Sequence, residues 1–374
     1  MIYFDYSATT KVDDDIIKLL EVVCKNNYAN PNSSHKLGQA SNKLIEDSIH
    51  TISTLLGIKE SEVIFTSGAS ESNNLAIKGV AFKNKNRGKH IISTRLEHSS
   101  VMSTLSYLST QGFEVEFVNL LEDGTVDLEH LKSIVRDDTI LVTITAVDSE
   151  LGIRQPIEEI GEILSKYNNC NFHSDITQCI GKNKIDLTNV DLASFSGHKI
   201  FCFKGIGVLY KKETVELIPI IHGGRSVTIY RSGTPQTELI VCLSKSLEKA
   251  LDELDNKYNY VLDLNNIIKE NLVKYKNIFI NSTNKSIPQI LNFSIVGIES
   301  DKFQKMLEEK NIFVSTKSAC TKGKEPSTSV FTITNNRDRA NSSIRVSLSY
   351  KTKKSEVVKF LKEFKNCYNS IDWK

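Results

Sequence analysis

The sequence feature that most constrains the fold is an alternation of short apolar segments with helix-length connections between residues 62 and 210. Strands separated by helix-length connections predict right-handed crossovers and a mainly parallel sheet with helices on both faces. Functional side chains are then expected beyond the carboxyl ends of the strands, where open α/β sheets bind their ligands. The predicted strands are Glu62–Thr66, Lys89–Thr94, Glu114–Val118, Thr139–Val147, Asn171–Asp175, Leu192–Ser196 and Gly207–Lys211.

The rest of the chain predicts a second, smaller domain. A helical stretch rich in Lys and Glu, from Thr237 to Tyr275, is expected to connect the two domains. The expected division of the 374 residues is a large domain of residues 15–253 and a smaller α+β domain of residues 1–14 and 254–374. The smaller domain should contain a strand at Gln289–Ser294, a helix at Asp301–Lys310, a polar loop at Ser315–Ser329, a strand at Ile344–Tyr350 and a final helix.

Composition and charge exclude several classes of protein. No apolar run approaches the roughly 20 residues that a membrane span requires, and the N-terminus lacks the basic start and apolar stretch of an export signal. The seven cysteines form no CxxC pair, which gives neither a disulfide framework nor a zinc-finger pattern. A net charge of +2 spread along the chain gives no reason to expect nucleic-acid binding. We therefore expect a cytoplasmic protein with no membrane segment, no nucleic-acid partner and no bound metal.

A strand, a tight turn and a helix start follow one another around residue 68. The strand Glu62–Thr66 runs into Ser67-Gly68-Ala69-Ser70, and a helix-compatible sequence follows. Exposed backbone N–H groups and the positive end of the helix dipole make such a turn a phosphate site, and Ser70 can add its hydroxyl. An ordinary helix cap would account for Ser70 equally well.

Three chemically useful side chains lie just after other predicted strands. Lys199 ends Ser196-Gly197-His198-Lys199 and can form a Schiff base if its surroundings lower its ordinary pKa of about 10.4. Asp175 can keep a pyridine nitrogen protonated, and His98 can stack on a flat cofactor or move protons. Taken singly, each also has an ordinary explanation: a surface lysine, a helix cap and a structural histidine.

Taken together, these segments resemble the cysteine desulfurases of the class V aminotransferase family. The resemblance covers nearly the whole chain, and nine motifs in the family's order are far more specific than any one of them. The motifs are Phe4-Asp5-Tyr6-Ser7-Ala8-Thr9-Thr10, Asn30-Pro31-Asn32-Ser33-Ser34-His35, Thr66-Ser67-Gly68-Ala69-Ser70-Glu71-Ser72-Asn73, Glu97-His98, Asp175-Ile176-Thr177-Gln178, Ser196-Gly197-His198-Lys199, Arg231-Ser232-Gly233-Thr234, Ser318-Ala319-Cys320 and Ile344-Arg345-Val346-Ser347.

The resemblance implies an enzyme of the pyridoxal-phosphate (PLP) transferase fold type I. By resemblance, Lys199 holds the cofactor covalently, Asp175 contacts the ring nitrogen, Gln178 contacts the ring hydroxyl, and His98 stacks on the ring and later donates a proton. The cofactor phosphate would be held by the residues of the turn and by two further side chains, with one residue entering from a second subunit. These residues are Ala69, Ser70, Ser196 and His198, and Thr234 of the second subunit, which implies a homodimer.

Two residues of the smaller domain complete the expected site. Alternation along Ile344–Tyr350 places Arg345 on the polar face of its strand, where it is either a solvated arginine or, as the resemblance implies, the partner of the substrate carboxylate. Cys320 lies in a polar loop beside Lys317, Lys322 and Lys324, whose charges favour the thiolate. The resemblance makes Cys320 the nucleophile that receives sulfur. A buried, inert cysteine is the alternative.

The sequence departs from the family pattern on the substrate side. Family members usually carry two asparagines where this chain has Asp148-Ser149, and the second one helps to hold the substrate. Ser149 is therefore a candidate substrate-binding residue. The shorter side chain of Ser149, and a charge on Asp148 if it faces the site, would weaken or change selectivity for cysteine.

The function that follows is conversion of L-cysteine to L-alanine, with a persulfide formed on Cys320 and its sulfur passed to an acceptor, as in iron–sulfur cluster assembly. Related reactions on the same fold, selenocysteine lysis or C–S cleavage of a modified cysteine, remain open because of Asp148 and Ser149. A non-catalytic sulfur-relay scaffold is a third alternative. A nicotinamide dehydrogenase fits poorly, because no GxGxxG follows a strand.

Overall fold

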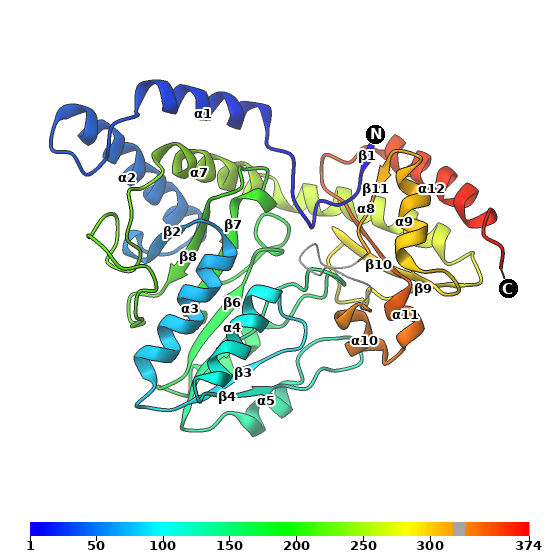
Figure 1. Cartoon of the computed structure of the whole chain (residues 1–374), viewed down its shortest axis with the longest axis horizontal. Coiled ribbons are helices and arrows are strands. Elements are labelled where there is room, and N and C mark those ends of the chain that lie inside the picture. Colours follow the sequence, from blue (N-terminus) through cyan, green and yellow to red (C-terminus); the bar gives the residue numbers. More distant parts are fainter. Residues whose placement is uncertain (317–325, 374) are drawn as a thin grey trace.

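A seven-stranded sheet forms the centre of the larger part of the molecule (Figure 1). The computed structural model describes residues 1–316 and 326–373. The order of the strands across the sheet is β2-β8-β7-β6-β5-β3-β4. The strands are β2 (Val63–Thr66), β3 (His90–Ser93), β4 (Glu114–Phe117), β5 (Thr139–Thr143), β6 (Asn171–Asp175), β7 (Leu192–Ser196) and β8 (Gly207–Lys211).

The sheet is parallel except at β8, which runs antiparallel to both β2 and β7. The chain returns from β7 to β8 through residues 197–206, which include only the short 3₁₀ helix Gly197–Lys199. A parallel return needs a crossover of a dozen or more residues, so this short connection produces an antiparallel neighbour. The expectation of a mainly parallel sheet is confirmed for the other strands.

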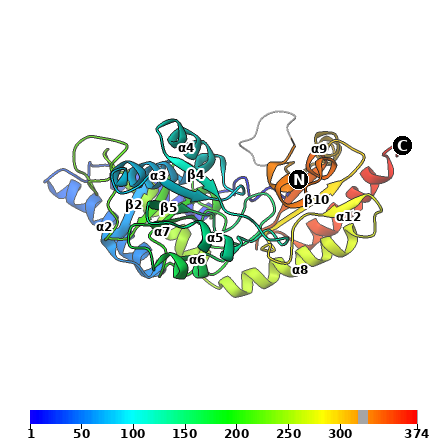
Figure 2. The same cartoon turned by 90° about the horizontal axis from the view of Figure 1, so that it is seen from below.

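Helices cover both faces of this sheet (Figures 1 and 2). Alternate residues of β2 point to opposite layers, because Ile64 joins the core beneath α3 and α4 whereas Val63 and Phe65 join the core beneath α2, α6 and α7. The helices are α1 (Asp14–Asn26), α2 (Lys36–Leu56), α3 (Ala69–Asn84), α4 (Ser99–Thr110), α5 (Leu128–Ile134), α6 (Ile157–Leu164) and α7 (Thr237–Leu251), with a 3₁₀ turn at Glu60–Glu62.

The smaller part is built on a three-stranded antiparallel sheet of order β12-β10-β9. The N-terminal strand also belongs here, since β1 pairs in parallel with β11 and Phe4 is buried in the same core. The elements are β1 (Ile2–Tyr3), α8 (Leu254–Leu272), β9 (Ile278–Ile280), β10 (Ile290–Ile295), α9 (Ser300–Glu308), β11 (Ile312–Phe313), α10 (Thr328–Thr334), α11 (Arg337–Asn341), β12 (Ser343–Ser347) and α12 (Lys354–Asn369).

Three expected elements differ from those observed by more than two residues. The helical stretch from Thr237 to Tyr275 is two helices, because Asp252 is extended and Glu253 has a positive φ of 46°. The strand predicted to end at Val147 is regular only to Thr143, although the N–H groups of Ile144 and Ala146 still donate to carbonyls of β6. The predicted strand Ile344–Tyr350 pairs only over Ser343–Ser347.

The hydrophobic cores divide in the same way as the sheets. One core contains Ile2, Phe4 and residues from Val261 to Cys367, and two others fill the layers of the large sheet. Figure 2 shows α8 passing below the molecule toward the smaller part. This division supports the predicted boundaries of 15–253 for the large domain and of 1–14 with 254–374 for the smaller one, which we retain as a proposal.

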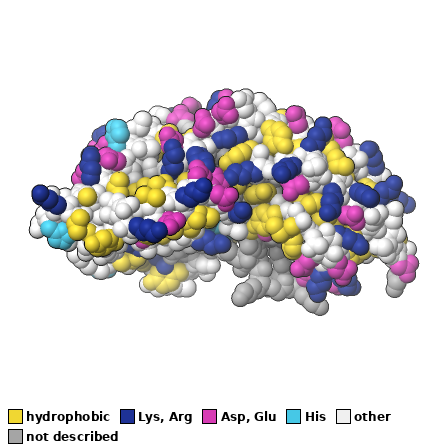
Figure 3. Space-filling model, turned by 90° about the horizontal axis from the view of Figure 1, so that it is seen from above, with side chains coloured by type: hydrophobic (Ala, Val, Ile, Leu, Met, Phe, Trp, Pro, Cys, Tyr) yellow, Lys and Arg dark blue, Asp and Glu magenta, His cyan; other side chains and the backbone are white. Residues whose placement is uncertain are grey.

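The surface carries charges of both signs. On the face in Figure 3, Lys and Arg side chains are interspersed with Asp and Glu, and apolar side chains lie between them. Within the described residues, no helix is long and apolar enough to cross a membrane.

Candidate active site

A cavity of about 320 Å³ opens where the carboxyl ends of the strands of the large sheet face the smaller domain. Its size lies within the range of about 300–1,000 Å³ typical of small-molecule sites. Of the predicted site residues that the structure describes, all but Thr234 line it: Ala69, Ser70, His98, Ser149, Asp175, Gln178, Ser196, His198, Lys199 and Arg345. Thr234 is exposed on another part of the large domain, and Cys320 lies outside the described residues.

The turn after β2 forms one wall of the cavity. Gly68 precedes α3 with φ 148° and ψ 177°, a conformation that essentially only glycine adopts. A Cβ on Gly68 would lie 3.3 Å from Ser196 Oγ, so the turn packs closely on the end of β7. Because the first N–H groups of a helix lack intrahelical partners, the start of α3 at Ala69 and Ser70 offers an anion site. Ser70 lies in the first turn of the helix and Gly68 is the N-cap, so the helix-cap alternative for Ser70 is wrong.

Asp175 and His98 are joined by a hydrogen-bond network on the floor of the cavity. Asn73 donates to Asp175 Oδ2 at 2.7 Å and to Ser100 Oγ at 2.9 Å. Ser100 in turn contacts His98 Nδ1 through its Oγ at 2.8 Å and through its backbone N–H at 3.2 Å. Since a backbone N–H can only donate, His98 Nδ1 accepts, and the neutral ring carries its proton on Nε2. Burial lowers the pKa of His98, so the neutral ring is the form present near pH 7.

Lys199 is held by the N-terminal segment of the chain. Its Nζ donates to the carbonyls of Ser7 and Ala8, each at 2.6 Å. The same segment contacts His198, whose carbonyl accepts from Thr10 and whose Nδ1 lies 3.1 Å from Thr9 Oγ1. Burial, with nearby Lys199 and Lys204, lowers the pKa of His198 to about 3.

Gln178 presents an amide whose orientation its neighbours determine. Its Nε2 donates to the carbonyl of Ser7 at 2.9 Å, and its Oε1 accepts from Lys182 Nζ at 2.5 Å. A carbonyl only accepts, so the amide nitrogen faces Ser7 and the amide oxygen faces Lys182. Burial, together with the positive charge of Lys199, lowers the pKa of Lys182 to about 7.

Arg345 reaches the cavity from β12 of the smaller domain. Its side chain is 1% exposed, which rules out a solvated edge-strand arginine. Nη2 contacts Asp5 Oδ1 at 2.8 Å, and Nη1 donates to the backbone carbonyl of Ser149 at 2.9 Å. Its Nε is buried without a partner among the described residues. Leaving a buried donor without an acceptor costs free energy of folding.

Asp148 does not face the cavity, contrary to the possibility raised from the sequence. It is buried, and its Oδ2 accepts from the N–H groups of Glu150 at 3.1 Å and Leu151 at 2.5 Å. The carboxyl therefore caps its own turn, as Asp does in an Asx-turn. Burial, with the charge of Glu150 nearby, raises the pKa of Asp148 to about 7.

Glu97 is a second acid next to the cavity, and its side chain is partly buried. Its Oε1 accepts from Thr94 Oγ1 and from the N–H of Thr145, each at 2.8 Å, while Oε2 is buried with no partner in the described chain. Burial, with smaller contributions from the charges of Asp175 and Asp148, raises the pKa of Glu97 to about 8. Glu97 is therefore largely a neutral acid at pH 7.

These groups fit PLP. The helix start at Gly68 provides an anion site, Asp175 offers a buried carboxylate for a ring nitrogen, and Lys199 supplies an amine in the same cavity. A fold and a site of this kind define a PLP-dependent enzyme. The comparisons with known proteins identify its family: the chain belongs to the aminotransferase class V family, whose model matches residues 2–360.

Individual relatives agree with this membership. A cysteine desulfurase IscS of Rickettsia rickettsii is 39% identical over 367 residues, which covers 95% of this chain and 88% of the relative. A solved structure described as a NifS-like protein superposes with a TM-score of 0.94 at 34% identity, covering 99% of this chain and 100% of the other. A structure described as SspA in complex with cysteine has a TM-score of 0.83 at 31% identity, covering 94% of this chain and 100% of the other.

Several residues of the site were not assigned roles from the sequence. Asn73 orients Asp175, Asp5 pairs with Arg345, and the Ser7 carbonyl binds both Lys199 and Gln178. All three lie inside motifs that carried the family resemblance, and this was the available signal. Lys182 lies outside those motifs. It follows Gln178 by one helical turn's spacing, which is too common a pattern to indicate a contact.

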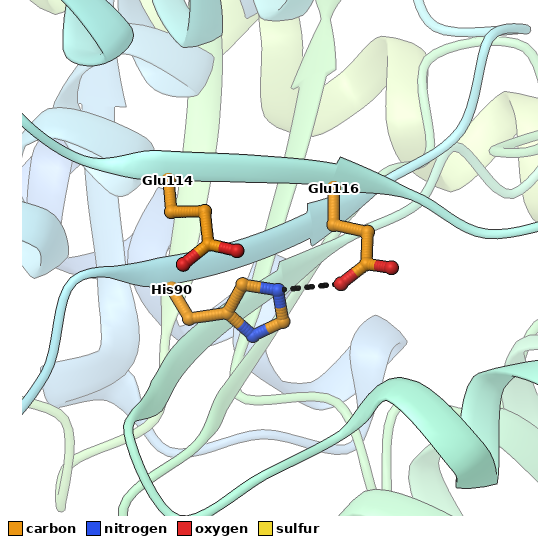
Figure 4. Close-up of side chains that lie close together, drawn as sticks. All are labelled: His90, Glu114 and Glu116. Carbon is orange, nitrogen blue, oxygen red and sulfur yellow. Dashed lines mark hydrogen bonds and ion pairs between the residues drawn. The ribbon is translucent and has the colours of Figure 1, made fainter.

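A cluster of His90, Glu114 and Glu116 lies on β3 and β4, at the edge of the sheet that β4 forms (Figure 4). His90 is buried, its Nδ1 lies 2.8 Å from Thr139 Oγ1, and its Nε2 lies 3.1 Å from Glu116 Oε2. Glu114 is paired with Arg136, and this interaction lowers the pKa of its carboxyl. Because protein groups already engage the ligand atoms of His90 and Glu114, the cluster is accounted for without a metal ion.

Proposed function

We propose that this protein is a PLP-dependent cysteine desulfurase that converts L-cysteine to L-alanine and receives the sulfur on Cys320. One observation carries the proposal: the amine of Lys199, the carboxylate of Asp175 and the guanidinium of Arg345 line one cavity between the two domains. The similarity to a named cysteine desulfurase over nearly the whole chain, and to a structure that contains cysteine, supports the choice of substrate.

The large domain supplies the groups that hold the cofactor. The first turn of α3 with Ser70, Ser196 and His198 would bind the phosphate, and Asp175 would keep a proton on the ring nitrogen. Bound PLP withdraws electrons from the α-carbon of an amino acid. Lys199, which would hold the cofactor covalently, is then the group that removes the α-proton through Nζ.

The remaining residues act on the substrate. Arg345 would bind its carboxylate, with two guanidinium nitrogens oriented by Asp5 and Ser149. His98 carries its proton on Nε2, because Nδ1 accepts from Ser100, and can donate that proton within the cavity. In the transfer, the Cys320 thiolate attacks the substrate sulfur, the C–S bond breaks and an S–S bond forms. The carbon takes up protons to give alanine, so the thiols of cysteine and enzyme become alanine and an enzyme persulfide.

A homodimer in which Thr234 completes the site of the partner subunit is part of the proposal. Thr234 is exposed and does not line the cavity of its own chain. Exposed apolar side chains occur on the same part of the large domain, namely Tyr28, Leu37 and Ile229, and a contact between Asn32 and Ser226 brings their segments together. Apolar exposure of this kind is typical of a subunit interface. We further propose a cytoplasmic location and an acceptor protein or small molecule for the sulfur, as in iron–sulfur cluster assembly.

The test is to incubate the purified protein with PLP and L-cysteine and to quantify alanine and protein persulfide. We expect both products from the wild type, and neither persulfide nor turnover from Cys320→Ala, which should still bind cysteine. Cys202 serves as a control thiol, because it is buried and burial raises its pKa. Absence of alanine from the wild type, or undiminished persulfide in Cys320→Ala, would contradict the proposal. Faster turnover of L-selenocysteine than of L-cysteine would favour the lyase alternative.

A further inference from the structure

A single turn of the large domain, residues 148–151, is bonded to the smaller domain at every position. The carbonyl of Ser149 accepts from Arg345, the carbonyl of Glu150 accepts from Asn292 at 3.2 Å, and the carbonyl of Leu151 accepts from Ser282 at 2.9 Å. The side chains of Asp148 and Glu150 add contacts to α10, described below. This turn therefore connects the substrate-facing wall of the cavity with the smaller domain.

The contact between Glu150 and Ser327 has a fixed direction. Ser327 is the N-cap of α10, and its Oγ accepts from the N–H of Val330 at 3.1 Å. The same Oγ lies 2.5 Å from Glu150 Oε2, and both residues are buried. Because a carboxylate only accepts, the hydroxyl proton of Ser327 points to Glu150. The hydroxyl group of Ser327 thus accepts a hydrogen bond in the helix cap and donates one in the contact between the domains.

Asp148 supports the same arrangement from within the turn. Its Oδ2 caps the N–H groups of Glu150 and Leu151, which holds the turn in shape, and Ser329 Oγ of α10 lies 3.4 Å from its Oδ1. Leu151 and Val330 pack in one small apolar cluster beside these groups. The first turn of α10 is therefore held to the large domain by two carboxyl groups and an apolar contact.

We call the contacts of Glu150 with Ser327 and of Asp148 with Ser329 the clamp. The clamp matters because of the position of α10 in the chain. Cys320 precedes Ser327 by only a few residues, so α10 begins where the segment carrying the candidate nucleophile ends. We propose that Glu150, supported by Asp148, is a positioning residue for sulfur transfer: it fixes the first turn of α10, which follows the Cys320 segment in the chain. The inference rests on the proposed function, since it gives Glu150 a part in the step that follows substrate binding.

The experiment separates the helix cap from the clamp by comparing Ser327→Asn with Ser327→Asp. Both replacements are good N-caps and nearly equal in shape, but only Asn can donate to Glu150, whereas Asp repels it. The readouts are the rate of persulfide formation on Cys320 in a single turnover with L-cysteine and the KM for L-cysteine. A third readout, the alkylation rate of Cys320 by iodoacetamide without cysteine, does not depend on the proposed activity.

We expect Ser327→Asn to react within about threefold of the wild-type rate and Ser327→Asp to form persulfide at least about tenfold more slowly with KM unchanged, since one charge-assisted contact is lost and replaced by repulsion. Glu150→Gln combined with Ser327→Asp should restore the rate, because the glutamine amide can donate to the carboxylate introduced at position 327. Asn336→Asp provides a matched control, because it makes the same charge change at the exposed N-cap of α11.

Equal rates for Ser327→Asn and Ser327→Asp, in both persulfide formation and alkylation, would overturn the inference. So would failure of the Glu150→Gln exchange to restore the rate. Should Ser327→Asp not fold, Glu150→Ala and Glu150→Gln test the same contact and leave the helix cap intact. Only the alanine variant should form persulfide slowly, because glutamine can still accept from Ser327. A wild type that forms no persulfide contradicts the proposed function instead, and the alkylation rates then still decide whether the clamp positions Cys320.

Discussion

The two halves of the cavity are built in different ways. On the large-domain side, Asp175, Ser196 and Lys199 lie at or just after the ends of adjacent strands of one sheet. Asp175 is bonded by Asn73 of α3, and Lys199 is bonded by Ser7 and Ala8 of the N-terminal segment. On the opposite side, Arg345 of the smaller domain and Ser149 of the large domain meet only because β12 and the turn after β5 come together from distant parts of the chain. The first half is built mainly on one sheet, whereas the second depends on how two domains pack. We therefore expect changes in the first half to affect cofactor chemistry and changes in the second to affect substrate recognition.

The largest effect is expected in the large-domain half. Lys199→Ala should abolish alanine formation, because the amine that removes the α-proton is gone, yet the phosphate and ring contacts should still bind PLP. Alanine assays and the cofactor content of the purified variant would measure both properties. Loss of PLP from the variant would mean that the helix start at Gly68 and the carboxylate of Asp175 do not hold the cofactor without the lysine.

A large but partial effect is expected in the other half from Arg345→Lys. Lysine keeps the charge but loses the planar pair of donors, which is worth about 3 kcal/mol for hydrogen bonds to a charged group, or roughly a hundredfold in kcat/KM. The loss should appear mainly in KM, with PLP content unchanged. Arg339→Lys is a control in the same domain, because Arg339 bonds Asn281 and the carbonyl of Ile280. A variant that lost PLP and kept its affinity for cysteine would contradict the assignment of substrate recognition to this half of the cavity.

A smaller gain is expected at Ser149, which lines the cavity but uses its carbonyl to hold Arg345. Ser149→Asn leaves that carbonyl in place and adds an amide that can donate to the substrate carboxylate. One such bond is worth about 0.5–3 kcal/mol, so kcat/KM for cysteine should rise by about threefold to a hundredfold. Steady-state kinetics with L-cysteine would measure the change, and an unchanged or lower kcat/KM would show that position 149 does not limit recognition.

The smallest effect on catalysis is expected for Asp148→Asn, because the side chain does not line the cavity and asparagine can still cap the turn. The variant should change kcat/KM by less than about twofold but should change the pH dependence of stability. The folded-state pKa of Asp148 is raised from its ordinary 3.8 to about 7, so the folded chain holds a proton that the unfolded chain has lost between these values. The resulting destabilisation grows as pH rises through this window and is complete above about pH 7.

Asparagine removes this pH-dependent cost and can still accept from the two N–H groups. The stability of Asp148→Asn relative to the wild type should therefore increase between about pH 5 and about pH 8, by about 1–4 kcal/mol on the scale of about 1.36 kcal/mol per pKa unit. Urea unfolding at the two pH values would measure it. A difference that shrinks as pH rises would mean that Asp148 is stabilised as a carboxylate in the fold.

The sequence predicted the large-domain half in detail, for a physical reason. Asp175, Ser196, Lys199 and the turn at Gly68 occur beside strand signals, and the carboxyl ends of neighbouring parallel strands necessarily lie together. The strands Asn171–Asp175, Leu192–Ser196 and Gly207–Lys211 have the predicted limits. The reversal at β8 was not foreseen, because it depends on a short connection that the spacing of apolar segments alone does not distinguish.

The other half could be predicted only through the family resemblance. Alternation correctly gave Arg345 a polar face, but whether that face meets water or protein depends on packing against Asp5 and Ser149, which lie far away in the sequence. The direction of the Asp148 carboxyl was likewise beyond the sequence, since it is set by the N–H groups of its own turn. The break at Asp252 and Glu253 was missed because both residues are compatible with a helix and neither Gly nor Pro marks the end.

Every other role in the large-domain half is defined around Lys199 as the residue that holds the cofactor. Lys204 also lines the cavity and is the natural competitor. Borohydride reduction of the PLP-loaded protein, followed by peptide mapping, identifies the lysine that carries the pyridoxyl group. We predict the label on Lys199. A label on Lys204, with Lys199 unmodified, would contradict the assignment and the division of the cavity that follows from it.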